Sequence, residues 1–152
     1  MAGESDPPLF QRIAFIGCGL IGSSLARVVR RDRLAGHVAV AARTQRTLDK
    51  VVELGLADTT TLEPAAAVEG ADMVMVCAPP GSYGKIASDM APALAPGCTV
   101  SDVGSVKRVA FRELAPHLPD GVQLGRRSRG HHGHDADPAE ETPRAGRTGQ
   151  GG

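Results

Sequence analysis

Three glycines in the segment Gly17-Cys18-Gly19-Leu20-Ile21-Gly22 have the spacing G-x-G-x-x-G, which can bring a pyrophosphate against the main chain. The first glycine permits a tight turn, the second lets the pyrophosphate approach, and the third lets a helix pack on a strand. The N-terminus of that helix would offer free N–H groups and a partial positive charge. A plain structural turn is the alternative. We predict dinucleotide binding here, because a strand pattern precedes the motif and a helix pattern follows it.

A second segment, Ala42-Arg43-Thr44-Gln45-Arg46, follows the next expected strand and bears on the choice of cofactor. An acidic residue at this point would bind the ribose 2′-hydroxyl of NAD, whereas a basic residue accommodates the 2′-phosphate of NADP. Arg43 can stack on adenine or pair with phosphate, Thr44 can donate a hydrogen bond, and Arg46 is close enough to assist. The alternative is a solvated basic loop. The absence of an acid in this segment favours NADP over NAD.

A third segment, Ser101-Asp102-Val-Gly-Ser105-Val-Lys107, lies between a late strand and a helix. This places it at the carboxyl edge of a parallel sheet, where ligands bind. Considered alone, Ser105 is most simply a helix N-cap that satisfies a free backbone N–H.

The elements that must position these segments follow from the hydrophobic pattern. Short apolar runs rich in β-branched residues predict strands at residues 12–17, 37–42, 71–78, 98–102 and 122–124. Helical spacing predicts helices at residues 20–31, 44–54, 83–94 and 106–114. Residues 57–68 are ambiguous and fit a short strand and a short helix. Alternating strands and helices predict an α/β fold of the Rossmann type, doubly wound around a mainly parallel sheet.

Composition narrows the possible partners. The chain of 152 residues has 17 basic and 17 acidic residues, so no net field draws it to nucleic acid or to an anionic membrane. Three widely spaced cysteines in apolar runs indicate buried thiols in a reducing compartment. No signal peptide or run of about 20 apolar residues is present. We therefore expect a cytoplasmic protein that binds a small molecule and has no metal site.

The pattern divides the chain into three parts. Residues 1–9 read as a flexible leader, and residues 10–124 as the dinucleotide-binding domain. Residues 125–152 contain no Leu, Ile, Val, Met, Phe, Tyr, Trp or Cys, so they predict a disordered tail. The shift in composition at one point, within an expected strand, suggests a change of reading frame.

Three features occurring together resemble the prephenate and arogenate dehydrogenases of tyrosine biosynthesis. They are the run from Ile13 to Ala26, the strand that ends at Pro79, and the segment from Asp102 to Lys107. The resemblance covers residues 12–124. It implies an NAD(P)-dependent oxidoreductase that acts on prephenate or arogenate by oxidative decarboxylation. It also implies that Ala78 and Pro79 contact the cofactor and that Ser105 is an active-site serine beside the nicotinamide.

The chain departs from that family after residue 124. The expected His-Pro-[Met/Ile]-Ala-Gly motif is absent, and so is the helical domain that dimerises and binds substrate. His131, His132 and His134 are not followed by Pro or Ala-Gly, so none takes the catalytic role. They fit a flexible polar tail, and weak adventitious metal binding is the alternative. We therefore expect a truncated, catalytically incomplete enzyme. The alternatives are a non-catalytic nucleotide-binding module and another Rossmann NAD(P)-dependent reductase.

Overall fold

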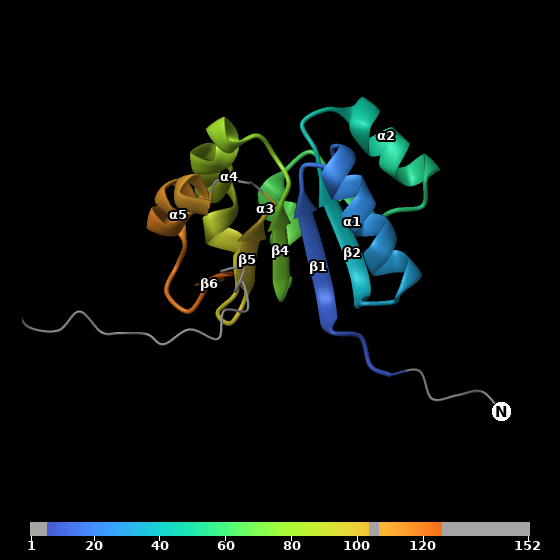
Figure 1. The fold of residues 1–152 in the computed structure, drawn as a ribbon, viewed down its shortest axis with the longest axis horizontal. Helices are drawn as coiled ribbons and strands as arrows, with labels where there is room; N and C mark the ends of the chain where they lie inside the picture. Colours follow the sequence, from blue (N-terminus) through green and yellow to red (C-terminus); the bar gives the residue numbers. More distant parts are fainter. Residues whose placement is uncertain (1–5, 104–106, 126–152) are drawn as a thin grey trace, which may run out of the picture.

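Strands and helices alternate along the part of the chain that the computed structural model describes, residues 6–103 and 107–125 (Figure 1). The strands are β1 (Phe10–Ile16), β2 (Ala35–Ala41), β3 (Thr59–Thr61), β4 (Met73–Val76), β5 (Thr99–Asp102) and β6 (Gln123–Leu124). The helices are α1 (Leu20–Arg31), α2 (Gln45–Glu53), α3 (Pro64–Val68), α4 (Tyr83–Met90) and α5 (Lys107–Leu114). None of these helices is long and apolar enough to cross a membrane.

All strand pairs in the six-stranded sheet are parallel, in the order β3-β2-β1-β4-β5-β6. Ile16 at the end of β1 is in register with Ala41 of β2 on one side and with Val76 of β4 on the other. The carboxyl ends of these strands therefore lie at one edge. The winding direction changes between β1 and β4, and ligands of such sheets bind at that switch point.

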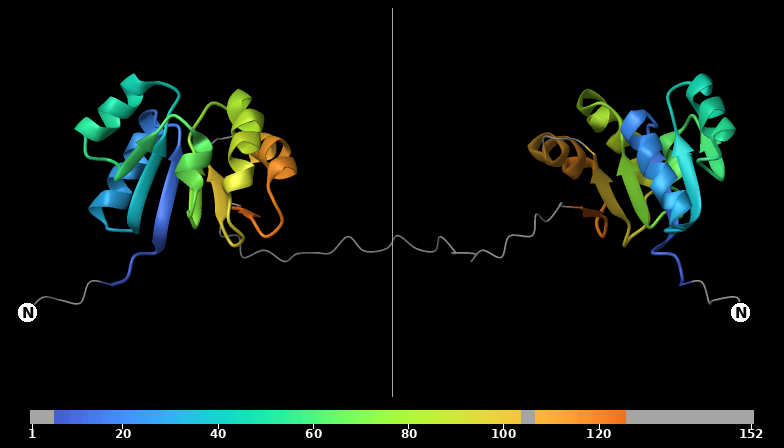
Figure 2. Two further views of the ribbon diagram at one scale, coloured as in Figure 1. Left: turned by 180° about the vertical axis from the view of Figure 1, so that it is seen from behind. Right: turned by 45° about the vertical axis from the view of Figure 1, so that its right-hand side comes forward.

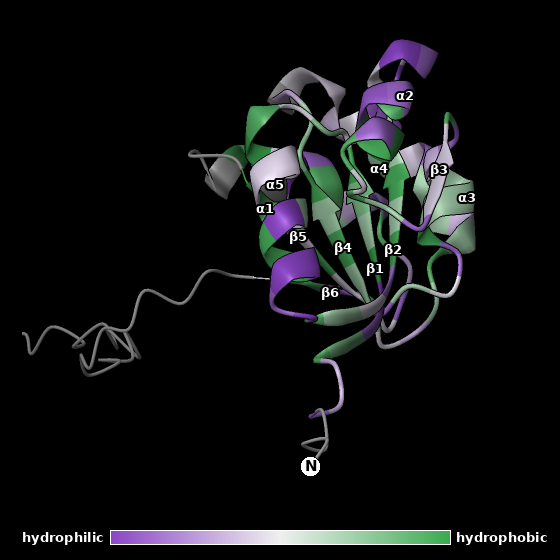
Figure 3. Cartoon of the chain, turned by 90° about the vertical axis from the view of Figure 1, so that its right-hand side faces the viewer, coloured by the Kyte–Doolittle hydropathy of each residue, from purple (hydrophilic) through white to green (hydrophobic). Residues whose placement is uncertain are grey.

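Alternate residues of the strands face two different helical layers (Figures 1 and 2). On β1, Ile13 and Phe15 belong to the cluster formed with α1 and α2, whereas Ala14 and Ile16 belong to the cluster formed with α3, α4 and α5. Because both faces are covered, the buried parts of β1, β2 and β4 are apolar on both sides of the sheet. Figure 3 shows the central strands largely in green and the exposed side of α2 in purple. Full burial of a side chain such as Phe15 contributes about 1.5–3 kcal/mol.

The doubly wound fold predicted from the hydrophobic pattern is confirmed, including the short strand and helix within residues 57–68. Helix α4 ends at Met90, four residues earlier than predicted, and a 3-10 turn (Ala91–Ala93) follows. Pro92 explains the difference, because proline lacks an N–H for the helical ladder. Gly125, assigned to the tail, donates to Val100 O at 2.7 Å and so prolongs the pairing of β6. The remainder of the predicted tail and residues 1–5 lie outside the described residues.

Helix α2 has well-defined ends. The Thr44 hydroxyl accepts a hydrogen bond from Thr47 N–H at 3.3 Å and caps the N-terminus. At the other end Gly55 has φ +65°, and the N–H groups of Gly55 and Leu56 donate to Val52 O and Val51 O. Glycine is favoured at this position because a side chain strains the left-handed conformation.

The carboxylate of Asp58 ties β2 to α1 and should make stability depend on pH. It accepts hydrogen bonds from Val38 N–H at 2.8 Å and from Arg30 Nη1 at 2.9 Å. Burial alone would raise the pKa of Asp58, but these two donors outweigh it and lower the pKa. The stabilisation is therefore present above the ordinary pKa of aspartate and is lost as the pH falls through the lowered value.

Asp58→Asn is expected to lower the free energy of unfolding at pH 7 by up to about 1 kcal/mol, since the ion pair is half-exposed. Urea denaturation at pH 7 and below pH 4 measures this, and the difference from the unmodified protein should shrink in acid. Asp89→Asn is the control, because the Asp89 carboxylate pairs with the exposed Lys85 ammonium. A difference that stays constant with pH would contradict the assignment.

Candidate functional site

The first glycine of the motif is required by the protein's own backbone. Gly17 joins β1 to α1 with φ +86°, a conformation that L side chains rarely adopt. A Cβ at Gly17 would lie 3.1 Å from Cys77 O and 3.2 Å from Ala78 N. The turn is fixed in place because Gly17 N–H donates to Ala41 O at 2.8 Å. The β1–α1 turn is thereby pressed against the end of β4.

The third glycine lets helix α1 approach the sheet. Gly22 is buried in the first turns of α1, and a Cβ there would lie 3.1 Å from Cys77 Cβ and 3.1 Å from Gly17 O. Both contacts are tighter than ordinary van der Waals distances. This is the helix-packing role predicted for the last glycine of the motif.

The second glycine of the motif, Gly19, differs from the other two, because neither its backbone conformation nor its neighbours exclude a side chain. Gly19 has φ −80° and ψ −158°, which any residue can adopt, and a Cβ would meet no atom within 4 Å. The exposed residue caps α1 without a side chain, and the first turn of α1 contains no acid. Leu20 and Ile21, which follow it, are 85% and 56% exposed. The backbone of Gly19 is therefore open to solvent at the N-terminus of α1.

The residues predicted to favour NADP over NAD lie where β2 passes into α2. Arg43, Thr44 and Arg46 are all exposed. Neither guanidinium forms an ion pair with any residue in the described ranges. No acid occupies the first turn of α2, so the helix N-terminus and two unpaired cations point to an anion. The Thr44 hydroxyl accepts from Thr47 N–H and also meets Thr47 Oγ1 at 3.0 Å, so it can donate to a ligand only when Thr47 is the donor in that pair.

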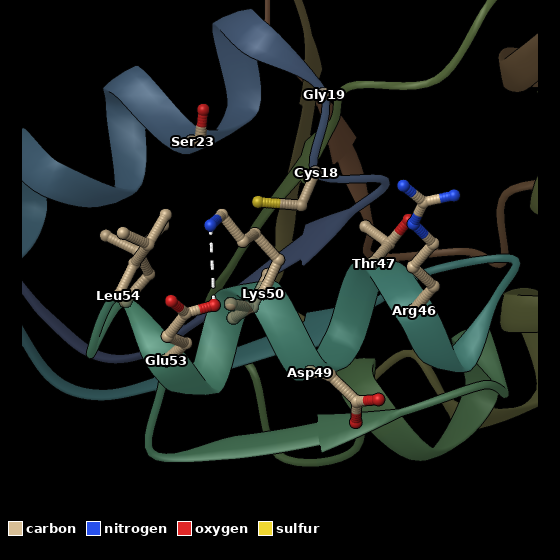
Figure 4. A pocket seen from close by; sticks show the side chains of 11 residues that line it. Cys18, Gly19, Ser23, Arg46, Thr47, Asp49, Lys50, Glu53 and Leu54 are labelled. Atoms are coloured by element: carbon tan, nitrogen blue, oxygen red, sulfur yellow. Dashed lines mark hydrogen bonds and ion pairs between the residues drawn. The ribbon is translucent and has the colours of Figure 1, made fainter.

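A groove of about 780 Å³ separates α1 from α2 (Figure 4). Its lining is Cys18, Gly19, Ser23, Arg46, Thr47, Asp49, Lys50, Val51, Glu53, Leu54 and Leu56. It meets the predicted site only at Cys18, Gly19 and Arg46. The Lys50 ammonium pairs with Glu53 Oε2 at 3.3 Å. Lys50 was not singled out from the sequence, although its helical spacing from Arg46 could have placed both on one face.

The turn between β4 and α4 brings the remaining predicted contacts to the same edge. Ala78 is half-buried, with its N atom beside Gly17, and Pro79, the next residue, is exposed. Behind the turn, the Tyr83 hydroxyl donates to Asp102 Oδ2 at 3.3 Å. Sequence analysis singled out neither residue of this buried pair for such a contact. Burial, followed by the Asp102 charge, raises the pKa of Tyr83 to about 12.

The two thiols at this edge are protonated at neutral pH. Burial raises the pKa of Cys18. Burial, then Cys18 and Asp102, raise the pKa of Cys77 to about 12. Because the thiolate is the nucleophile, neither cysteine is poised for covalent chemistry. Both thiols are free and only half-buried, whereas Cys98 is fully buried.

Some predicted residues cannot be placed. Ser105 and the three tail histidines lie outside the described residues. Among the described residues no group of three His, Cys, Asp or Glu side chains could hold a metal ion. The geometry therefore gives a glycine turn at the start of α1, flanked by the N-terminus of α2 and by the turn after β4.

Comparison with known proteins supports the same class of site. Residues 25–124 match the family described as prephenate dehydrogenase, nucleotide-binding domain. Over 114 residues the chain is 36% identical to cyclohexadienyl dehydrogenase of Zymomonas mobilis subsp. mobilis, covering 75% of this chain and 39% of that protein.

Two solved structures agree with this result. Prephenate dehydrogenase from A. aeolicus, in complex with hydroxyphenyl propionate and NAD+, has a TM-score of 0.67 and 27% identity, covering 81% of this chain and 43% of that one. Synechocystis arogenate dehydrogenase has a TM-score of 0.64 and 27% identity, covering 74% and 45%. The chain thus spans well under half the length of each of these relatives.

The fold and the glycine turn define a dinucleotide-binding domain of the kind that oxidoreductases use. More particularly, the chain belongs to the prephenate dehydrogenase nucleotide-binding domain family. It is the NAD(P)-binding domain of an enzyme in that family, whose members are dehydrogenases.

Proposed function

We propose that the chain binds NADP in preference to NAD, as the cofactor domain of a prephenate or arogenate dehydrogenase of tyrosine biosynthesis. The observation that carries the binding site is the open space above Gly19. Neither backbone strain nor crowding requires glycine there, since its φ is ordinary and no atom lies near the position of a Cβ. A ligand that must contact the backbone supplies the missing reason.

The pyrophosphate is proposed to lie over the N-terminus of α1. Gly19, Leu20 and Ile21 begin that helix, and their N–H groups lie at the positive end of a 12-residue helix dipole. Gly17 and Gly22 shape the turn, and Cys18 lies between the turn and the groove. These six residues, 17–22, form the proposed phosphate-binding segment.

The adenosine 2′-phosphate is proposed to lie between Arg43, Thr44 and Arg46. The two guanidinium groups make no ion pair within the described ranges, so binding a phosphate would not break an existing contact. Guanidinium groups also suit the geometry of phosphate oxygens. This arrangement supports NADP over NAD.

Arg43→Ala is expected to weaken NADP binding by about 1.5–3 kcal/mol and to leave NAD binding nearly unchanged, because one charge-assisted hydrogen bond is lost. Titration calorimetry with both cofactors measures the two affinities. Arg27→Ala is the matched control, since Arg27 is an exposed cation on α1 with no ion pair to a described residue. Equal losses for NADP and NAD would assign Arg43 to adenine stacking instead.

The nicotinamide end is proposed to lie against Ala78 and Pro79, toward β5, with Ser105 as the active-site serine of the dehydrogenase. When bound, the nicotinamide would supply the hydride acceptor for the oxidative decarboxylation that aromatises the substrate ring. This chain's proposed contribution is to hold the cofactor so that its reactive face is presented to the substrate. NADP titration of the purified full chain tests the proposal, and failure to bind either cofactor would refute it.

A further inference from the structure

A buried hydrogen bond lies directly behind the proposed nicotinamide edge. Tyr83 is 1% exposed and Asp102 is 6% exposed, and the Tyr83 hydroxyl donates to Asp102 Oδ2 at 3.3 Å. Asp102 is the one buried polar or charged residue in the described ranges. Burying a carboxylate is costly unless donors surround it, and the Tyr83 hydroxyl is one of the donors to Asp102.

The two residues fasten both ends of the β4–α4 turn, residues 77–82, to the end of β5. Where the turn begins, Val76 is paired in register with Asp102, and Val103 N–H donates to Val76 O at 3.2 Å. Where the turn ends, Tyr83 opens α4 and its hydroxyl reaches the same aspartate. The chain therefore leaves the sheet beside Asp102 and returns over it.

The position of this turn matters for the cofactor site. It carries Ala78 and Pro79, and the backbone of residues 77–78 is the surface that Gly17 contacts. It also carries Gly81, which has no positive φ and no atom within 4 Å of a Cβ position. Gly81 thus repeats the pattern of Gly19, an exposed glycine that the protein's own packing does not require.

We propose that Tyr83 is a positioning residue, which through Asp102 holds the β4–α4 turn where the nicotinamide half of the cofactor contacts it. The inference rests on the proposed function, since it assigns NAD(P) to this edge. The hydroxyl is the part of Tyr83 that matters. Its ring belongs to the core cluster with Val76, Ala87 and Val100, so phenylalanine would keep the packing and lose only the bond.

Tyr83→Phe should therefore raise the Kd for NADP roughly tenfold in the full chain, the effect of losing one hydrogen bond to a charged group. Thr59→Val is the matched control. It also removes a hydrogen-bonded hydroxyl, which meets His37 Nε2 at 3.0 Å at the far edge of the sheet. Thr59→Val should change the Kd less than twofold. Calorimetric Kd values and melting temperatures are measured for each variant, so that a loss of affinity can be compared with a loss of stability.

Tyr83 also reports its own environment, because it is the only tyrosine in a chain without tryptophan. Absorbance titration of the tyrosinate should show a pKa near 12 in the folded protein, shifted toward 10 in Asp102→Asn. Saturating NADP should change the tyrosine emission of the unmodified chain, which a purely structural role would not produce.

The outcomes separate the two proposals. If the unmodified chain binds neither NADP nor NAD, the proposed function fails and this inference falls with it. If the unmodified chain binds but Tyr83→Phe binds equally well, the positioning role alone is overturned. A tyrosinate pKa that is unchanged in Asp102→Asn would overturn the hydrogen bond on which the role depends.

Discussion

Gly17→Ala should destabilise the domain by about 2–5 kcal/mol, more than Gly19→Ala in the same turn, because it adds both backbone strain and crowding. An L side chain at φ +86° costs about 1–2 kcal/mol. The new Cβ would also lie 3.1 Å from Cys77 O, a backbone atom that the sheet holds in place. Crowding of this kind costs about 1–3 kcal/mol. Urea denaturation of both proteins measures the difference.

A second glycine isolates the crowding from the backbone strain. Gly97 has φ +87°, almost the same as Gly17, but a Cβ there would meet nothing within 4 Å. Gly97→Ala should therefore cost only the backbone contribution, about 1–2 kcal/mol. If the two variants lose equal stability, the close approach of the β1–α1 turn to β4 would not be what constrains Gly17.

The helices and strands could be predicted from sequence where the hydrophobic period was strong. Helix α1 begins at Leu20 and ends at Arg31, as predicted, because its apolar residues recur at helical spacing after a glycine turn. Strand β4 is shorter than predicted, since apolar residues continue beyond its last paired residue, Val76. An apolar run shows burial but not where strand pairing stops.

The site could be predicted only where its residues are close together in the sequence. Local motifs located the glycine turn and the basic β2–α2 turn, because each is contained in a few consecutive residues. The Tyr83–Asp102 bond joins residues 19 apart on a helix and a strand. Such a contact depends on how α4 packs against β5, which no local pattern encodes. The α1–α2 groove likewise depends on the spacing of two separate helices.

Gly19→Ala is expected to separate binding from folding. Alanine fits the backbone of Gly19, and the open space accepts its methyl group. The folding cost should be about 1 kcal/mol at most, because alanine is a much poorer N-cap than glycine but adds no backbone strain or crowding here. A pyrophosphate lying on the backbone would instead meet the methyl group. Overpacking costs about 1–3 kcal/mol, which corresponds to a loss of roughly 5- to 150-fold in affinity.

Gly55→Ala provides the opposite control. Gly55 ends α2 with φ +65° and open space at the Cβ position, so alanine there should lower stability by about 1 kcal/mol. Gly55 is not one of the proposed cofactor contacts, so the Gly55→Ala variant should bind NADP as tightly as the unmodified chain does.

The most direct test is the NADP affinity of the full-length unmodified chain, Gly19→Ala and Gly55→Ala, measured by calorimetry beside their unfolding free energies. We predict that both variants lose at most about 1–2 kcal/mol of stability, and that only Gly19→Ala also loses affinity for NADP. If Gly19→Ala binds NADP and NAD as tightly as the unmodified chain, the glycine turn is not where the dinucleotide lies.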